Sequence, residues 1–358
     1  MAKNKKKFNP DVSVIISMYN AEDYVAECLQ SLLDQTLENI EVVVVDDCST
    51  DNSVAVVKSF MPKFEGRLIL NKTKTNSGYP GFPRNMALNL AHGKYIYFLD
   101  SDDFIDSTAL EDFFKVAEEF QADVVHSERF FEYKQIDGAY KDFVNSFQQG
   151  GFVETPTLET SDIGERVNKF INKNFLWWGC NKLFRRDFLL ENKIKFPDTT
   201  SFEDYVFVFQ CIIAAKNYVR VPFASYHYRI RTDSLSHKLR TTMEVIKNMA
   251  VAVSTMDNFM LGRKFFIDNP EYRYDVIDFF AQWRMDAMFD KIFYAGGPSL
   301  PEIYALFYQH SFSDKKNDSA ALTSYLFVAE NIYKMHTRNL ENQIADLKNQ
   351  LAEIQNQT

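Results

Sequence analysis

The chain has 358 residues, of which 46% are hydrophobic and 25% charged, and its formal net charge is −9 at pH 7. This length gives room for one large domain or two moderate ones. The acidic balance and the lack of a long basic face argue against nucleic acid as a partner, because binding to nucleic acid depends on neutralising phosphates.

The cysteines and the N-terminal tail indicate the cellular compartment in which the protein is expected. There are four widely spaced cysteines without a CxxC pair: Cys28, Cys48, Cys180 and Cys211. This pattern predicts reduced thiols in a cytoplasmic protein. Residues 1–10 form a basic tail, and no apolar stretch approaches the roughly 18 residues of a membrane span. We expect a solvated tail; weak peripheral contact with the acidic inner face of a membrane is the alternative.

Between residues 11 and 128, apolar strands alternate with amphipathic helices. Buried strands are predicted at 12–17, 40–46, 67–71, 95–99 and 123–127. Helices are predicted at 22–34, 51–60, 84–91 and 107–120. Strands that are apolar on both faces and joined by helices form a parallel sheet covered on both sides. The predicted fold class is therefore α/β, with a Rossmann-like, mostly parallel central sheet and helices on both faces.

The pattern becomes mixed after residue 128. Helices are predicted at 162–172 and 201–215, a strand at 181–184, and one or two short strands within 219–228. From residue 239 the chain is predicted to be helical, with a break at Gly296-Gly297-Pro298. We expect a domain over 11–238 in two halves, 11–128 and 129–238. A helical region over 239–335 and a terminal helix over 336–358 complete the predicted organisation.

Apolar residues in the terminal helix alternate spacings of four and three, the a/d pattern of a coiled coil. They are Leu340, Ile344, Leu347, Leu351 and Ile354. The clean pattern covers only about two heptads, short of the three or four that define a coiled coil. One interpretation is a homo-oligomer joined through this helix. The other is a helix that docks on its own domain.

An acidic cluster, Asp100-Ser101-Asp102-Asp103, follows the strand at 95–99. Oxygen ligands of this kind suit Mg²⁺ or Mn²⁺, hard cations that also bind phosphate oxygens. Neighbouring carboxylates repel one another, so a cation would stabilise the cluster. The alternative is a helix start before Ser107, but that leaves Asp100 and Asp102 unexplained.

Polar residues also follow two other predicted strands, with Ser17 and Tyr19 after the first and Asp46 and Asp47 after the second. The carboxyl ends of parallel strands meet at one edge of a sheet, where ligands bind in such folds. We therefore expect these side chains and the acidic cluster to form one site.

The chain carries a series of motifs in a fixed order: Met18-Tyr19-Asn20, Val45 to Asp51, Asn76-Ser77-Gly78, Pro83-Arg84-Asn85 and Gly93 to Asp103. In that order and spacing they resemble the inverting glycosyltransferases of family 2, which have a GT-A fold and use nucleotide-sugar donors. The stretch from Ser77 to Asn85 is similar to that of the enzymes that build bacterial capsule and wall teichoic acid. The resemblance is dense over the first third and thin to about residue 240.

The resemblance implies a site for a nucleotide-sugar, with a UDP-sugar as the expected donor. The matching positions are Ser17, Tyr19, Asn20, Asp47, Gly78, Arg84, Asp100 and Ser101. Asp47 would accept a hydrogen bond from the base, and Arg84 would pair with the diphosphate. Asp102 would be the principal ligand of Mn²⁺ or Mg²⁺, with Asp100 contacting the metal or the ribose.

The acceptor side is implied by Ser201-Phe202-Glu203-Asp204, which resembles the Glu-Asp motif of the family. Inverting transfer needs a carboxylate that takes the proton of the attacking hydroxyl, and we assign this role to Asp204 with Glu203 beside it. The acceptor would be a cell-surface glycan or its lipid-linked precursor. The same residues also make a good helix start, which is the alternative.

Residues 226–234 resemble the segment that folds over the diphosphate in this family. Arg231 and Ser234 would bind phosphate, and His227 falls where some relatives place a metal-binding histidine. A structural histidine on a strand is the alternative for His227.

Two other functions remain open. A nucleotidyltransferase acting on a sugar phosphate would be expected to carry a Gly-rich basic loop after the first strand, where this chain has Met18-Tyr19-Asn20-Ala21. A non-catalytic scaffold assembled through the terminal helix is the other. Carboxylates at all the chemical positions favour an enzyme over a scaffold, and the resemblance implies an enzyme of the hexosyltransferase type.

Overall fold

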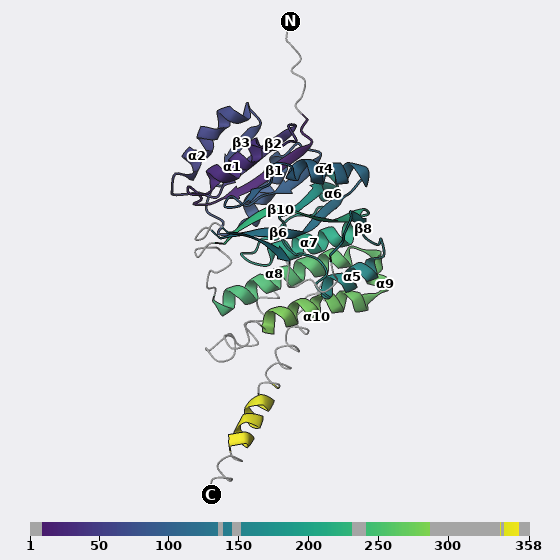
Figure 1. Cartoon of the computed structure of the whole chain (residues 1–358). Helices are drawn as coiled ribbons and strands as arrows, with labels where there is room; N and C mark the ends of the chain where they lie inside the picture. The colour runs from purple at the N-terminus through teal and green to yellow at the C-terminus, as the bar shows by residue number, and fades with distance from the viewer. Residues whose placement is uncertain are drawn as a thin grey trace. The chain divides into compact units, whose positions relative to one another are not determined.

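The computed structural model describes residues 9–134, 139–144, 152–230, 241–286, 337 and 340–350 (Figure 1). The chain divides into two compact units, residues 1–238 and 239–358. Within the described ranges, no helix is long and apolar enough to cross a membrane. Residues 1–8 of the basic tail and the predicted break at 296–298 lie outside those ranges.

The first four strands of unit 1 form the predicted parallel sheet. They are β1 (Val12–Met18), β2 (Ile40–Asp46), β3 (Leu68–Lys72) and β4 (Tyr95–Phe98), in the spatial order β3-β2-β1-β4. Met18 lies opposite Asp46, and Ile15 lies opposite Phe98. The ends of β1, β2 and β4 therefore reach the same edge, as the sequence predicts.

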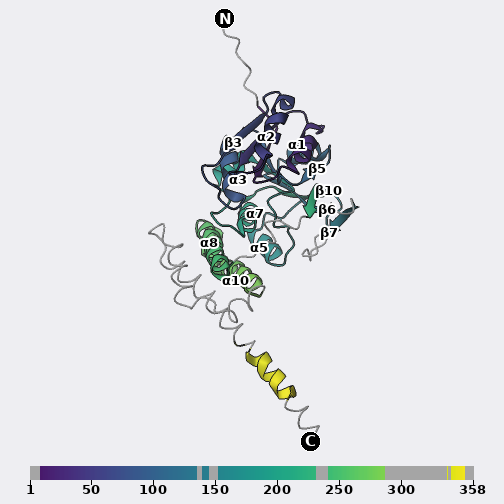
Figure 2. The ribbon, with the colours of Figure 1, turned by 90° about the vertical axis from the view of Figure 1, so that its left-hand side faces the viewer.

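Helices cover this part of the sheet on both sides (Figure 2). They are α1 (Val25–Leu33), α2 (Ser53–Phe60), α3 (Gly81–Leu90) and α4 (Ala109–Glu119), with a short 3₁₀ helix, η1, at Met61–Phe64. α3 packs against β1 and β2, whereas α1 packs beside α2 and β5. α3 begins three residues before the predicted start, which places Arg84 inside its first turn.

The second half of the sheet is mixed, so the expectation of a mostly parallel sheet holds only for its first half. It comprises β5 (Phe104–Ile105), β6 (Val124–Lys134), β7 (Ala139–Val144), β8 (Thr157–Leu158), β9 (Lys182–Arg185) and β10 (Tyr218–Ile230). β9 is antiparallel to both β4 and β6, while β10 is parallel to β6. Two register shifts interrupt the β6–β10 pairing, which explains why the sequence pattern of one strand looks like two.

Three further helices complete unit 1: α5 (Ile163–Ile171), α6 (Arg186–Glu191) and α7 (Glu203–Ala214). α7 is buried along most of its length, from Tyr205 to Ile213, and packs against α5. The sequence pattern misses α6, β5, β7 and β8, which are short elements fixed by their neighbours rather than by a period of their own.

Unit 2 contains α8 (Thr242–Leu261), α9 (Lys264–Asp268) and α10 (Pro270–Asp286). α8 opens with a capping box between Thr241 and Glu244. Residues 340–350 are helical, and Leu340, Ile344 and Leu347 expose 45%, 51% and 63% of their surface. Leu351 and Ile354 lie outside the described residues, so the coiled coil stays a prediction.

A buried carboxylate ties the strands together at the amino end of the sheet. Glu41 Oε1 accepts hydrogen bonds from Ser13 Oγ at 2.5 Å and from Gly93 N at 3.2 Å. A Cβ atom on Gly93 would lie 2.5 Å from the backbone nitrogen of Ser13. Gly93 is therefore required by close backbone packing just before β4.

We expect Gly93→Ala to lower the free energy of unfolding by about 2–3 kcal/mol, because backbone must move to admit the methyl group. Urea denaturation followed by circular dichroism measures this. Gly262→Ala is the control, since its Cβ atom would meet nothing closer than 3.6 Å. Equal stability of the two variants would contradict the packing argument.

Candidate functional site

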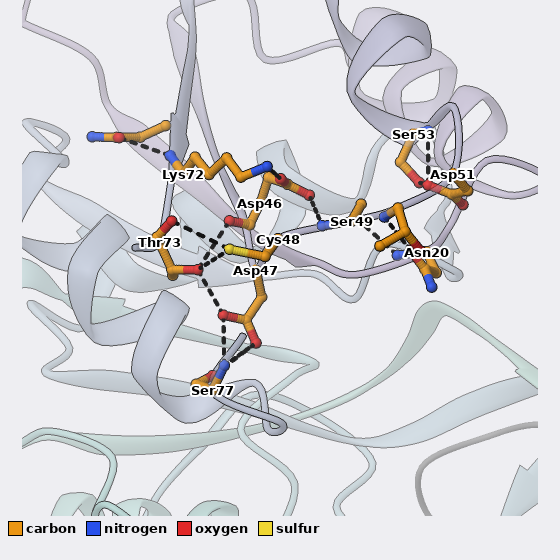
Figure 3. Close-up of polar contacts among 12 residues, drawn as sticks. Asn20, Asp46, Asp47, Cys48, Ser49, Asp51, Ser53, Lys72, Thr73 and Ser77 are labelled. Atoms are coloured by element: carbon orange, nitrogen blue, oxygen red, sulfur yellow. Dashed lines mark hydrogen bonds and ion pairs between the residues drawn. The ribbon is translucent and has the colours of Figure 1, made fainter. Parts of the chain in front are cut away.

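The carboxyl edge of the sheet brings together residues from three strand ends. Ser17 is half-buried near the end of β1, and Tyr19 beyond it exposes 45% of its surface. Asn20 has a left-handed backbone with φ of 47°. Its Oδ1 accepts from Thr50 N at 2.8 Å, and its own N–H donates to Ser49 Oγ at 3.0 Å. Asn20 thus joins the loops that follow β1 and β2 (Figure 3).

The Asp47 carboxylate holds the loop before α3 (Figure 3). Oδ1 accepts from Thr73 Oγ1 at 2.9 Å, and Oδ2 accepts from Ser77 N at 2.9 Å and Ser77 Oγ at 2.8 Å. The N–H of Gly78, which has φ of 79°, lies 3.3 Å from Oδ2. Asp47 is only 4% exposed. The Asp47 carboxylate therefore accepts hydrogen bonds from Thr73, Ser77 and Gly78 and fixes the loop over residues 73–78. The left-handed backbone of Gly78 lets its N–H approach this carboxylate.

The Arg84 guanidinium connects two carboxylates that the sequence places 104 residues apart. Arg84 NH2 lies 2.6 Å from Asp100 Oδ1, and NH1 lies 2.8 Å from Asp204 Oδ1. The Arg84 side chain is 3% exposed and lies over the Phe196 ring at 5.2 Å. The two acidic partners hold its pKa well above the ordinary value despite burial. Arg84 is therefore charged and links the acidic cluster to α7.

Asp204 lies in the first turn of α7 and points at Arg84. The residue before α7 is Phe202, with φ of 70°, and its side chain makes no capping hydrogen bond. Burial raises the pKa of the Asp204 carboxyl, while the Arg84 charge opposes that shift. A Cβ atom on Gly179 would lie 2.9 Å from Asp204 Oδ1. The ion pair with Arg84 argues against helix capping as the role of Asp204; Glu203 beside it is half-buried.

Within the acidic cluster the carboxylates differ in their surroundings. Asp103 is 2% exposed, and its oxygens accept from Tyr226 Oη at 2.6 Å and from Arg229 N at 2.8 Å. Burial, followed by the charges of Asp102 and Asp100, raises the pKa of Asp103 well above its ordinary value. Asp103 therefore anchors β10, whereas Asp102 is only half-buried. Ser101, between Asp100 and Asp102, is buried.

His227 on β10 makes contacts typical of a structural residue. Its Nε2 lies 2.7 Å from Asp106 Oδ1, and Phe104 and Phe131 stack on its ring. The metal-ligand role of His227 stays a prediction that these contacts do not favour. Arg231 and Ser234 lie outside the described residues.

The described residues contain no group of three or more His, Cys, Asp or Glu side chains arranged to hold a metal. Asp100 and Asp102 are the carboxylates that remain accessible at the strand end, and the Asp100 side chain is 34% exposed. Two carboxylates suit a hard divalent cation that takes its other ligands from water and a diphosphate.

The sequence analysis missed several residues of this site. Thr73 and Ser77 hold Asp47, Gly179 leaves space for Asp204, and Cys180 Sγ lies 3.6 Å from Arg84 NH2. Ser77 lies within a quoted motif, but its partner is 30 residues away. No local spacing indicates Gly179, because its role depends on contact with another element.

Asp47→Asn tests the loop contacts. The asparagine amide would face the N–H groups of Ser77 and Gly78, and each unsatisfied donor costs about 1–3 kcal/mol. We expect amide hydrogen exchange over residues 73–79 to accelerate by about tenfold or more. Asp46→Asn is the matched control, because Asp46 Oδ1 accepts from Ser49 N instead. Unchanged exchange in the Asp47 variant would contradict this role.

Residues 13–191, half of the chain, match the family model for glycosyl transferase family 2. The chain is 33% identical over 252 residues to a poly(ribitol-phosphate) β-glucosyltransferase from Bacillus spizizenii, covering 69% of this chain and 35% of that protein. It is 32% identical over 224 residues to the poly(ribitol-phosphate) β-N-acetylglucosaminyltransferase TarS from Staphylococcus aureus, covering 62% of this chain and 36% of TarS.

The crystal structure of S. aureus TarS 1–349 superposes with a TM-score of 0.65 at 22% identity, covering 93% of this chain and 92% of that one. This likeness confirms the GT-A fold that the resemblance implies. The chain spans about a third of the length of the two curated relatives. On the family match, the chain belongs to glycosyltransferase family 2.

Proposed function

We propose that this protein transfers a sugar from a UDP-sugar to a hydroxyl group of a bacterial cell-surface glycan of the teichoic-acid class, with inversion. The observation that carries the proposal is the Arg84 guanidinium between Asp100 and Asp204. One guanidinium thus pairs with Asp100, at the edge proposed to bind the donor, and with Asp204, the proposed base on α7. Sugar transfer needs a donor site and a base that are held close to each other.

The donor proposal draws on the relatives as well as on the edge of the sheet. TarS has been crystallised with UDP and with UDP-GlcNAc. In this chain, exposed Tyr19 and half-buried Ser17 flank the loop that Asp47 orders. We propose that the uridine lies against this loop, and that Asn20, Gly78 and Ser101 shape its walls. Arg231 and Ser234 are proposed to contact phosphate on the strength of the resemblance alone.

Arg84 acts, in this proposal, through its carboxylate partners. Its two terminal nitrogens are already paired and its side chain is 3% exposed. Direct pairing with the diphosphate, which the resemblance implies, is less well supported by this geometry. A guanidinium held in this way fixes the position of both carboxylates.

A divalent cation, Mn²⁺ or Mg²⁺, is proposed to be held by Asp102 with Asp100. Such an ion would stabilise the charge that builds on the departing diphosphate. Burial is the first cause of the raised pKa of Asp103, and the neighbouring negative charges of Asp102 and Asp100, which a cation would neutralise, add to it. His227 is left out of the proposed set because Asp106 is its partner.

Asp204 is the proposed general base. As the acceptor oxygen forms a bond to the anomeric carbon, the bond from that carbon to the diphosphate oxygen breaks, and the acceptor proton passes to Asp204. Burial raises the pKa of this carboxyl, which makes it a stronger base than an exposed aspartate. Glu203 is proposed to support the base from the adjacent position.

The rival functions receive less support. The stretch after β1 holds Tyr19 and Asn20 in place of the Gly-rich basic loop expected of a nucleotidyltransferase. A scaffold role would leave the paired carboxylates around Arg84 without a purpose. Retention of charged groups at a cost in desolvation is typical of functional sites.

Asp204→Asn should lower turnover by about 10³-fold or more because the base is lost, and the Kd for UDP should stay within about twofold because Arg84 keeps its pairing with Asp100. In the wild type, activity should fall as the pH drops through the raised pKa of Asp204. Radiolabelled sugar transfer and isothermal titration calorimetry measure these effects. Asp187→Asn on the exposed face of α6 is the control, with its side chain 70% exposed. Normal turnover of the Asp204 variant would contradict the assignment.

Asp102→Asn tests the metal. We expect the variant to need about tenfold more Mn²⁺ for half-maximal UDP binding, since one of two proposed ligands loses its charge. Chelation with EDTA should abolish wild-type transfer, and added Mn²⁺ or Mg²⁺ should restore it. Full transfer in EDTA would exclude a metal-dependent reaction.

A further inference from the structure

A cavity of about 610 Å³ lies between α1 and the strands β5, β6 and β10. α1 contributes Glu27 and Gln30 to its wall, and Asp34 follows directly after α1. The segment that follows the acidic cluster contributes Phe104 and Asp106. Of the proposed donor and catalytic residues, none lines it. The cavity therefore needs an explanation separate from sugar transfer.

One wall is a row of three stacked aromatic rings. His227 pairs across the sheet with Phe104 on one side and with Phe131 on the other. The ring centroids are 4.5 Å apart for Phe104 and His227 and 4.9 Å apart for Phe131 and His227, with interplanar angles of 4° and 21°. Both phenyl rings are half-buried. The strand register thus fixes a rigid, largely apolar wall.

Carboxylates face this wall from two elements. The Asp106 side chain is 47% exposed, and its Oδ1 is oriented by His227 Nε2 at 2.7 Å. The Glu27 side chain is 51% exposed and is paired with Arg229. On the next turns of α1, Gln30 Nε2 donates to Asp34 Oδ1 at 2.9 Å. The rim is therefore rich in acceptors that are held in place by neighbouring side chains.

The lining restricts the chemistry of a ligand. The lining has three carboxylates, Glu27, Asp34 and Asp106, and one histidine, and the only arginine paired with these carboxylates in the described contacts is Arg229. This excess of negative charge repels phosphate and other anions. An apolar wall beside oriented acceptors suits a molecule with C–H faces and several hydroxyl donors. The volume is within the range of about 300–1,000 Å³ typical of small-molecule sites. A neutral sugar has all of these properties.

We propose that this cavity is an accessory site that binds one or two neutral sugar residues. The glycan that supplies these neutral sugar units follows from the proposed function, and the phosphate links of a teichoic acid would lie outside the cavity. Sugar binding itself needs no donor, metal or base. Phe104 directly follows Asp103. Arg229 Nε donates to the backbone oxygen of Asp102 at 2.8 Å, and the same guanidinium pairs with Glu27 in the cavity wall. The cavity wall is therefore joined to the acidic cluster through the chain and through Arg229.

Gln30→Trp tests the site, because Gln30 is exposed on α1 and a large side chain there would fill the cavity without altering the core. Asn168→Trp on the exposed face of α5 is the matched control. Binding of methyl β-glucoside, methyl N-acetyl-β-glucosaminide and glucose 6-phosphate to the full chain is measured by saturation-transfer NMR. UDP binding is measured on the same samples.

We expect the neutral glycosides to bind wild type and Asn168→Trp with Kd near 1 mM, and Gln30→Trp about tenfold more weakly. Glucose 6-phosphate should bind about tenfold more weakly than the glycosides. Phe131→Leu, a second variant that keeps an apolar strand residue, should also weaken glycoside binding. Equal glycoside binding in both tryptophan variants, no binding at all, or tighter binding of the phosphate would overturn the proposal. If the wild type does not bind UDP, that result would instead count against the proposed function.

Discussion

The arrangement of the site depends on one buried cation. Arg84 is almost fully removed from water, and a buried guanidinium is stable only if acidic partners compensate its charge. Asp100 comes from the end of β4 and Asp204 from the first turn of α7. Because both bind the same side chain, the two halves of unit 1 are fixed relative to each other at the place where donor and acceptor would meet.

Much of the first half could be predicted from local pattern. The buried runs at β1 and β2 are apolar on both faces, and the parallel register brings Met18 opposite Asp46. The polar residues that follow must then share an edge, because parallel strands end together. The predicted bounds of β2 match the structure, and those of the helices differ by up to three residues at their ends, where the side-chain period says least.

The contacts within the site could not be predicted in the same way. Asp47 and Ser77 are 30 residues apart, and Arg84 and Asp204 are 120 residues apart. The first pair depends on the path of the loop before α3. The second depends on how α7 and the mixed second half of the sheet pack against the first half. The family resemblance identified Arg84 and Asp204 as candidates, but assigned them separate partners. Gly179 carries no signal of its own.

The most direct test of this account is a double-mutant cycle on the free energy of unfolding. It uses Arg84→Gln, Asp204→Asn and the two together, measured by urea denaturation. The account predicts that the double variant is more stable than the sum of the single losses implies, with a coupling energy of about 1–3 kcal/mol. Losses that add within about 0.5 kcal/mol would show that the two residues do not interact and would contradict the central role of the Arg84 bridge.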